Sequence, residues 1–231
     1  MTATDVHRLV LWDIDHTLVD LAGAGRAWYE AALLAMGVEL HTHPDYGGRT
    51  ERAITTDALT LHGLEPTEDN IQLLWQHLIR ESETTRSSLP ASGRALVGAA
   101  EAITELDRCG AVQTLVTGNL PDVAVHKLEP FGLERHLDLE IGGYGTLSTS
   151  RPDLVAHAID AATAKYGPFS SEQVAVIGDT PHDVHAALAH GVVAVAVATG
   201  RHDAAELTAA GAHTVLPDLA DLDAVRSALL G

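Results

Sequence analysis

The chain has 231 residues, of which 46% are hydrophobic and only 4% aromatic, which excludes a disordered chain and predicts a core of Ala, Val, Leu and Ile. The 14 basic and 32 acidic residues give a net charge of −18, which would repel a phosphate backbone. We therefore expect no nucleic-acid partner, and a phosphorylated ligand would need a metal ion or a few fixed basic residues.

Short apolar runs rich in valine alternate with helical patterns along most of the chain. The runs lack the polar alternation of half-exposed strands, which is typical of buried parallel strands. The expected strands are 9–12, 112–116, 174–177, 192–197 and 214–216, and the expected helices are 123–131, 154–166, 181–190, 204–210 and 219–230. This order predicts an α/β fold, a Rossmann-like doubly wound parallel sheet, with ligands bound at the carboxyl ends of the strands.

The first expected strand leads directly into two carboxylates, Asp13 and Asp15. Two acidic side chains at the end of a buried strand repel each other and lose hydration. Such a pair is most easily kept when a divalent cation lies between the two or when one carries a proton for catalysis. The alternative is that Asp15 only caps a turn.

A long insertion separates the first expected strand from the second, with far more residues than one crossover helix needs. Within it, Ala27, Ala31, Leu34 and Ala35 share one helical face. Another face is shared by Ile71, Leu74, Trp75 and Leu78, and we expect Thr67 to be the N-cap residue of that helix. Residues 89–93 have the composition of a return linker. We expect an inserted α-helical cap over 19–89 and a catalytic core formed by 1–18 and 90–231.

The second expected strand is followed by Thr117, Gly118 and Asn119. A hydroxyl, a glycine that allows close backbone approach and the start of a helix together can bind an anion. The alternative is an ordinary helix start with Asn119 as the N-cap residue.

A third carboxylate, Asp179, follows the strand expected at 174–177. Three acidic side chains at neighbouring strand ends favour an oxygen-ligand site suited to Mg²⁺. Thr180, Pro181 and Asp183 form a variant capping box, so Asp183 is either a helix cap or a residue that supports a metal ligand.

These motifs, in this order, resemble those of the haloacid dehalogenase-like hydrolase superfamily, and the resemblance covers essentially the whole chain. The insertion resembles the small α-helical cap of the phosphoglycolate phosphatase and β-phosphoglucomutase type. The motifs that carry the resemblance are Asp13-Ile14-Asp15-His16-Thr17, Thr117-Gly118-Asn119, Arg151-Pro152-Asp153 and Gly178-Asp179-Thr180-Pro181-His182-Asp183.

The resemblance implies a role for each matching residue. Asp13 would be the nucleophile that becomes an aspartyl phosphate, and Asp15 would be the general acid and base. Mg²⁺ would be held by the Asp13 carboxylate, the Asp15 backbone carbonyl and the Asp179 carboxylate. Thr117, with the amides of Gly118 and Asn119, would bind the phosphoryl oxygens.

The chain departs from the family pattern at two positions. His16 stands where the superfamily commonly has glycine, and we expect a solvated or hydrogen-bonded side chain there. The usual lysine of the third motif is replaced by Arg151, and Lys127 in the preceding helix is its rival for the phosphate-binding role. Arg151 is preferred because it begins the helix that leads into the Asp179 strand.

In the cap, the segment Gly47-Gly48-Arg49-Thr50-Glu51 resembles the loop that faces the leaving group in such enzymes. Arg49 is a candidate contact for a second anionic group, and the alternative is a solvated arginine at a helix start. His41 and His43 suggest a metal pair, but 14 histidines make such spacing expected by chance.

The expected function is a Mg²⁺-dependent phosphatase that acts on a small phosphorylated metabolite through an intermediate on Asp13. The alternatives are a phosphomutase, a 2-haloacid dehalogenase that attacks carbon and needs no Mg²⁺, or a non-catalytic ligand-binding relative.

We expect the protein to be soluble and cytoplasmic, as a monomer or homodimer without a membrane partner. The single cysteine, Cys109, excludes an internal disulfide and fits a reducing compartment. Residues 1–5 lack the features of a secretory signal. The longest apolar run, 191–198, is far shorter than the roughly 20 residues of a membrane span.

Overall fold

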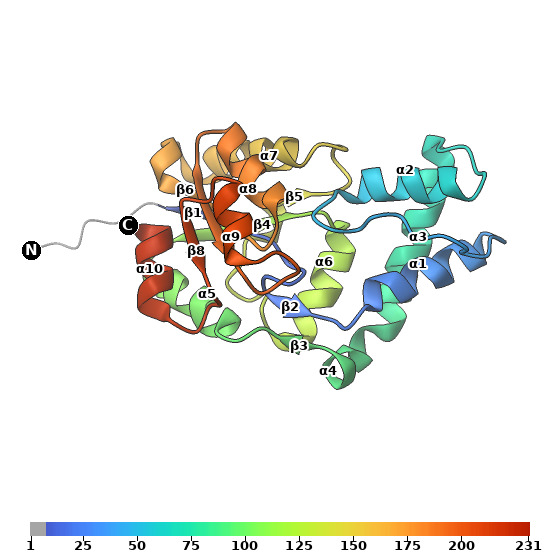
Figure 1. Cartoon of the computed structure of the whole chain (residues 1–231), viewed down its shortest axis with the longest axis horizontal. Helices are drawn as coiled ribbons and strands as arrows, with labels where there is room; N and C mark the ends of the chain where they lie inside the picture. Colours follow the sequence, from blue (N-terminus) through green and yellow to red (C-terminus); the bar gives the residue numbers. More distant parts are fainter. Residues whose placement is uncertain (1–7) are drawn as a thin grey trace, which may run out of the picture.

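The computed structural model describes residues 8–231, so the segment 1–5 lies outside the described residues. The core is a six-stranded parallel sheet in the order β5-β4-β1-β6-β7-β8 (Figure 1). Its strands are β1 (Leu9–Trp12), β4 (Val112–Thr117), β5 (Gly143–Tyr144), β6 (Val174–Gly178), β7 (Val193–Val197) and β8 (Thr214–Leu216).

Helices cover both faces of this sheet. They are α5 (Ala99–Arg108), α6 (Pro121–Leu128), α7 (Arg151–Tyr166), α8 (Pro181–Ala189), α9 (Ala204–Ala209) and α10 (Leu222–Leu230). Because successive strand residues point to opposite faces, Leu9 and Leu11 join the core beneath α7 and α8, whereas Val10 and Trp12 join the core beneath α5 and α10. The doubly wound α/β fold expected from the sequence is confirmed.

Several element boundaries differ from those expected. The helix expected at 123–131 ends at Leu128 and continues as a 3-10 turn, Glu129–Phe131. Helix α10 begins three residues later than expected, because the Asp221 side chain accepts hydrogen bonds from the amides of Asp223 and Ala224 and so caps the helix there. The two-residue strand β5 and helix α5 were not anticipated.

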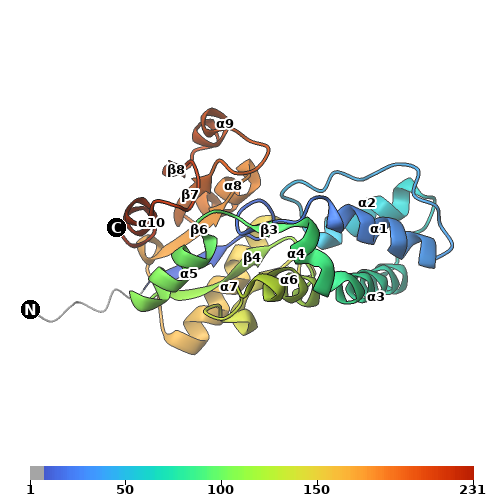
Figure 2. The ribbon, with the colours of Figure 1, turned by 90° about the horizontal axis from the view of Figure 1, so that it is seen from below.

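The insertion forms helices α1 (Ala24–Ala35), α2 (Glu51–Leu61), α3 (Glu68–Thr85) and α4 (Leu89–Ser92). Helices α1, α2 and α3 lie together beyond one end of the core in both views (Figures 1 and 2). An antiparallel ribbon of β2 (Val19–Asp20) and β3 (Arg94–Ala95) joins the two parts. Residues 89–92, expected in a return linker, instead form a short helix that begins with Leu89 and Pro90.

The buried face of α1 is not the one expected from its alanines. Ala27 and Ala35 are exposed, and Leu34 is 67% exposed. The core instead receives the adjacent face, which carries Trp28, Tyr29, Ala32 and Leu33. Burying two aromatic rings and a leucine removes far more apolar area from water than burying alanines.

The buried face of α3 agrees with the sequence, since Ile71, Leu74, Trp75 and Leu78 are all buried. The Thr67 hydroxyl accepts a hydrogen bond from the Asn70 amide and caps the helix as expected. In the part of the chain from residue 8 onward, no helix has both the length and the apolar character to cross a membrane.

Candidate active site

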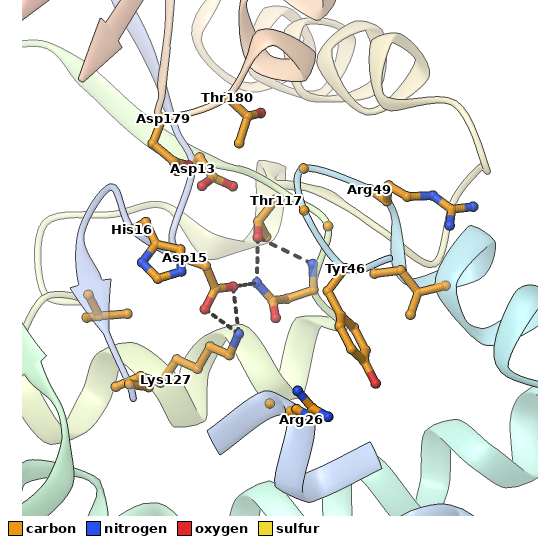
Figure 3. A pocket seen from close by; sticks show the side chains of 18 of the residues that line it. Asp13, Asp15, His16, Arg26, Tyr46, Arg49, Thr117, Lys127, Asp179 and Thr180 are labelled. Atoms are coloured by element: carbon orange, nitrogen blue, oxygen red, sulfur yellow. Dashed lines mark hydrogen bonds and ion pairs between the residues drawn. The ribbon is translucent and has the colours of Figure 1, made fainter. Parts of the chain in front are cut away.

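The carboxyl ends of three adjacent strands meet at one cavity of about 290 Å³. Strand β1 delivers Asp13, β4 ends at Thr117 and β6 is followed by Asp179 (Figure 3). The cavity wall contains every site residue expected from the sequence: Asp13, Asp15, Arg49, Thr117, Gly118, Asn119, Lys127, Arg151 and Asp179. Segments that are far apart in the sequence are therefore brought together where a parallel sheet places its ligands.

Asp13 lies in a buried ion-pair cluster with Arg151 and Asp183. One guanidinium nitrogen of Arg151 is 2.6 Å from Asp13 Oδ1 and 2.5 Å from Asp183 Oδ1. Arg151 begins helix α7, so the backbone delivers its side chain to the strand ends. All three side chains are almost fully buried, which makes the arginine the fixed counter-charge of the two acids.

The arginine does not compensate all the negative charge in this cluster. Burial raises the pKa of Asp13 to about 7, and the Asp183 and Asp15 charges add to that rise against the effect of Arg151. Burial, followed by the charges of Asp13 and Asp183, raises the pKa of Asp179 to about 9. The site therefore favours additional positive charge near these carboxyl groups.

The donor set fits a divalent cation. Carboxylate oxygens of Asp13, Asp179 and Asp183 all lie within 4.8 Å of one another, and they form the one such cluster found among residues 8–231. With Asp15 included, four carboxyl groups face two cations, Arg151 and Lys127. Full ionisation of all four would leave two uncompensated negative charges, which equal the charge of one divalent ion. An all-oxygen set suits Mg²⁺.

Asp183 caps helix α8, which is one of the two roles expected for it, and it also contacts the arginine of the cluster. Its Oδ2 accepts hydrogen bonds from the Thr180 amide at 3.0 Å and the Thr180 hydroxyl at 2.7 Å, which completes the expected capping box of α8. Its Oδ1 faces Arg151 and belongs to the acidic cluster. The cap therefore fixes the carboxyl group that holds the arginine in place.

Asp15 is held by a separate set of donors (Figure 3). Lys127 Nζ donates to both carboxylate oxygens, at 2.7 and 2.6 Å, and Asn119 Nδ2 donates to Oδ2 at 2.9 Å. Although partial burial acts in the opposite direction, Lys127 and Asn119 hold the pKa of Asp15 below its ordinary value. The two candidates for the phosphate-binding cation therefore contact different acids, Arg151 contacting Asp13 and Lys127 contacting Asp15.

The loop after β4 is built around the Thr117 hydroxyl. Its Oγ1 accepts hydrogen bonds from the Asn119 side-chain amide at 2.7 Å and from the Asn119 backbone amide at 3.3 Å. Helix α6 begins at Pro121 with Leu120 as its N-cap residue. Asn119 is therefore not the helix cap that the alternative interpretation required, and its side chain links Thr117 to Asp15.

His16 adopts the left-handed backbone conformation, with φ of 60°. Glycine reaches this conformation without a steric cost, which explains why it is common at this position in the superfamily. The side chain is exposed, as expected, and lines the cavity. The backbone carbonyl of His16 accepts a hydrogen bond from the Thr199 hydroxyl at 2.5 Å.

Arg49 lines the cavity, but its guanidinium group is engaged elsewhere. It donates to Asp57 at 2.7 Å and to the Asp45 carbonyl at 3.3 Å, and it points away from Asp13 and Asp15 (Figure 3). The N-cap residue of α2 is Thr50. A role for Arg49 toward a second anionic group stays a prediction.

The start of α2 packs tightly against the loop after β4. The Glu51 amide donates to the Gly118 carbonyl at 2.7 Å, and the Arg52 amide donates to the Gly145 carbonyl at 2.9 Å. A β-carbon on Gly118 would overlap the carbonyl oxygen of Arg49, so only glycine allows this approach.

Several cavity residues could not be singled out from the sequence: Arg26, Tyr29, Tyr46, Glu51, Arg201 and His202. Glu51 ends the cap-loop segment 47–51, where it resembles any acidic residue in a first helical turn, and the others lie outside the recognised motifs. His43 does not join the acidic cluster, since its ring nitrogens contact Arg26 at 2.8 Å and Tyr46 at 3.2 Å. His41 pairs with His62 at a distance of 6.4 Å between ring centroids.

Comparisons with known proteins agree with the geometry. A family model described as haloacid dehalogenase-like hydrolase matches residues 10–197. The phosphoglycolate phosphatase of Agrobacterium fabrum is 27% identical over 206 residues, which cover 88% of this chain and 85% of that protein. The tyrosine-protein kinase PtkA of Mycobacterium tuberculosis is 26% identical over 228 residues, which cover 96% of this chain and 72% of that protein.

Among solved structures, CbbY from Rhodobacter sphaeroides in complex with phosphate superposes with a TM-score of 0.70 at 17% identity and covers 94% of this chain and 96% of that one. At this identity the similarity establishes the fold alone. The family match covers most of the chain, including the strand ends that carry Asp13, Thr117 and Asp179. This protein belongs to the haloacid dehalogenase-like hydrolase family.

Proposed function

We propose that the protein is a Mg²⁺-dependent phosphatase that hydrolyses small phosphorylated metabolites through an aspartyl-phosphate intermediate on Asp13. The observation that carries the proposal is the convergence of Asp13, Asp15 and Asp179 at one cavity with two buried cations and the Thr117 loop. The phosphoglycolate phosphatase among its relatives supports phosphorus as the reacting centre.

In the proposed reaction, an Asp13 carboxylate oxygen attacks phosphorus while the ester oxygen leaves and takes a proton from Asp15. Asp15 can hold that proton once the phosphoryl group draws the Lys127 ammonium away, because this contact is what lowers the Asp15 pKa in the free site. In the second half, Asp15 removes a proton from a water molecule that attacks the aspartyl phosphate, which releases inorganic phosphate and restores Asp13. This division replaces one difficult displacement by two easier ones, and acid–base catalysis would contribute about 10²–10⁴-fold.

The basic residues would position these groups. Arg151 fixes the orientation of the attacking carboxyl group through its contact with Asp13. Lys127 holds both oxygens of Asp15, and an incoming phosphoryl group would compete with them for its ammonium protons. Thr117 and the amides of Gly118 and Asn119 would receive the phosphoryl oxygens.

The metal would be held by the Asp13 carboxylate, the Asp15 carbonyl and the Asp179 carboxylate. Mg²⁺ bound there would offset the repulsion between the anionic ester and the anionic nucleophile.

Phosphate release from a panel of sugar, polyol and organic-acid phosphates tests the proposal, with and without Mg²⁺ and with an Asp13→Asn control. We expect Mg²⁺-dependent release that EDTA abolishes and that the control lacks. An enzyme that is inert on the whole panel would contradict it. Chelator-resistant release of halide from 2-haloacids would identify a dehalogenase, and sugar-phosphate isomerisation without free phosphate would identify a mutase.

A further inference from the structure

One buried acidic side chain in the cavity has no part in the proposed reaction. Glu51 is the first residue of α2, lines the cavity and is only 7% exposed. A glutamate in a first helical turn ordinarily remains at the surface, where it interacts with the helix dipole. Capping does not require its burial here, because the Thr50 hydroxyl already caps α2 by accepting from the Ala53 amide at 3.3 Å.

Side chains from three cap helices fix one oxygen of this carboxyl group. Glu51 Oε1 accepts hydrogen bonds from the Tyr29 hydroxyl of α1 and, at 3.2 Å, from the Thr55 hydroxyl of α2. Trp75 of α3 donates its indole N–H to the Thr55 hydroxyl at 2.9 Å. Tyr29, Thr55 and Trp75 are themselves buried, so the network holds the carboxyl group in one orientation.

The other oxygen, Oε2, has no hydrogen-bond partner in the described part of the chain and is not sealed away from solvent. Glu51 lines the cavity, and the charges of Lys127 and Asp15 both act on its pKa, so its carboxyl group lies on the side of the cavity near these residues. Because the cavity is only about 290 Å³, a ligand whose phosphoryl group lies at Asp13 would extend its leaving group toward the cap residues.

The chemistry of Oε2 selects hydrogen-bond donors. Burial raises the pKa of Glu51 to about 7, against the effects of the Tyr29 hydrogen bond and the Lys127 charge, so near neutral pH the group is a strong acceptor for a substantial fraction of the time. A substrate carboxylate at the same place would meet an acidic group instead of a cation. Three arginines of the cavity wall have internal partners, since Arg26 donates to His43, Arg49 to Asp57 and Arg151 to Asp13. The fourth, Arg201, is exposed and lies beside Gly47.

We propose that Glu51 is a specificity-determining residue whose Oε2 accepts a hydrogen bond from a hydroxyl group of the leaving group. The preferred substrates are then phosphate esters of small polyols or sugars, in preference to esters of hydroxy acids such as phosphoglycolate. This inference rests on the phosphatase function proposed above and adds its substrate class.

The test compares three substrates: glycerol 3-phosphate, propyl phosphate, which lacks both hydroxyl groups, and phosphoglycolate. Glu51→Gln keeps an acceptor for Tyr29 and Thr55 but places an amide N–H₂ at the position of Oε2. We expect Glu51→Gln to lower kcat/KM for glycerol 3-phosphate about tenfold, because a charged hydrogen bond is replaced by a neutral one. The kcat/KM for propyl phosphate should change less than about threefold.

Glu51→Leu removes both oxygens and should lower kcat/KM for glycerol 3-phosphate at least about 100-fold. Glu65→Gln, an exposed glutamate of the same cap, is the matched control. An equal loss on all three substrates in Glu51→Gln would show a merely structural role, and a wild-type preference for phosphoglycolate or propyl phosphate would overturn the substrate class. If the wild-type protein released phosphate from no ester, the phosphatase proposal itself would fail, which is a separate result.

Discussion

The buried carboxyl group of Glu51 makes the stability of the protein depend on pH in a way that one substitution isolates. In the folded protein burial raises the pKa of Glu51 to about 7 from an ordinary value of 4.5. Between these values the folded chain keeps a proton that the unfolded chain releases. The free energy of unfolding therefore falls as pH rises through this window and levels off above it.

The size of this pH-dependent change in stability follows from the difference between the two pKa values of Glu51. Each pH unit within the window corresponds to about 1.4 kcal/mol, so the contribution between pH 4.5 and pH 7 is on the order of 3 kcal/mol. Glu51→Gln is neutral at every pH and lacks this contribution. Other titrating groups, including Asp13 and Asp179, are common to both proteins, and their effects cancel in the difference.

Urea denaturation of the wild-type and Glu51→Gln proteins at a series of pH values, in EDTA, measures this difference. We expect the free energy of unfolding of Glu51→Gln, relative to wild type, to rise by on the order of 3 kcal/mol between pH 4.5 and pH 8. Glu65→Gln controls for the loss of one negative charge from an acidic chain. If the free energy of unfolding of Glu51→Gln relative to wild type stayed constant or fell between pH 4.5 and pH 8, the argument from burial would be refuted.

Further predictions concern the acidic cluster, its two cations and the left-handed residue His16. Arg151→Ala leaves Asp13 and Asp183 buried without their cation, so urea denaturation should show a loss of about 3–5 kcal/mol and assays should show almost no phosphate release. Lys127→Ala should reduce phosphate release less than Arg151→Ala does, because Asp15, the partner of Lys127, is partly exposed. A loss of phosphate release in Lys127→Ala that equals or exceeds the loss in Arg151→Ala would contradict this order. His16→Gly should change the free energy of unfolding by less than about 1 kcal/mol, whereas His16→Val, which suits the left-handed conformation poorly, should lower it by at least about 1 kcal/mol; equal effects would argue against backbone strain. Asp179→Asn should raise the Mg²⁺ concentration needed for half-maximal phosphate release at least about tenfold, and an unchanged requirement would remove Asp179 from the metal site.

Local patterns were sufficient for most of the core. Valine-rich runs identified β1, β4 and β6 because a strand buried on both faces has no room for polar residues, and Asp13, Thr117 and Asp179 followed from their places at the strand ends. The two-residue strand β5 has no such signal, because its pairing depends on β4 beside it.

The cap was harder to predict because its packing decides which side chains are buried. The alanine pattern of α1 favoured the wrong face, since the helix buries Trp28 against Thr85 of α3 and Tyr29 against Glu51 of α2. Glu51 follows an N-cap threonine like many surface residues, and only the tertiary contacts with Tyr29 and Thr55 place it in the cavity. The partition of roles between Arg151 and Lys127 likewise depends on which acid each one reaches in space.

The central claim is that Asp13 attacks phosphorus and carries the phosphoryl group. Acid quenching during Mg²⁺-dependent turnover, followed by mass spectrometry of the peptide that contains Asp13, tests it most directly. We predict a hydroxylamine-sensitive phosphoryl group on Asp13 that is absent from Asp13→Asn. Turnover that leaves Asp13 unmodified while phosphate appears on another side chain would contradict the account, as would phosphate release by Asp13→Asn at the wild-type rate.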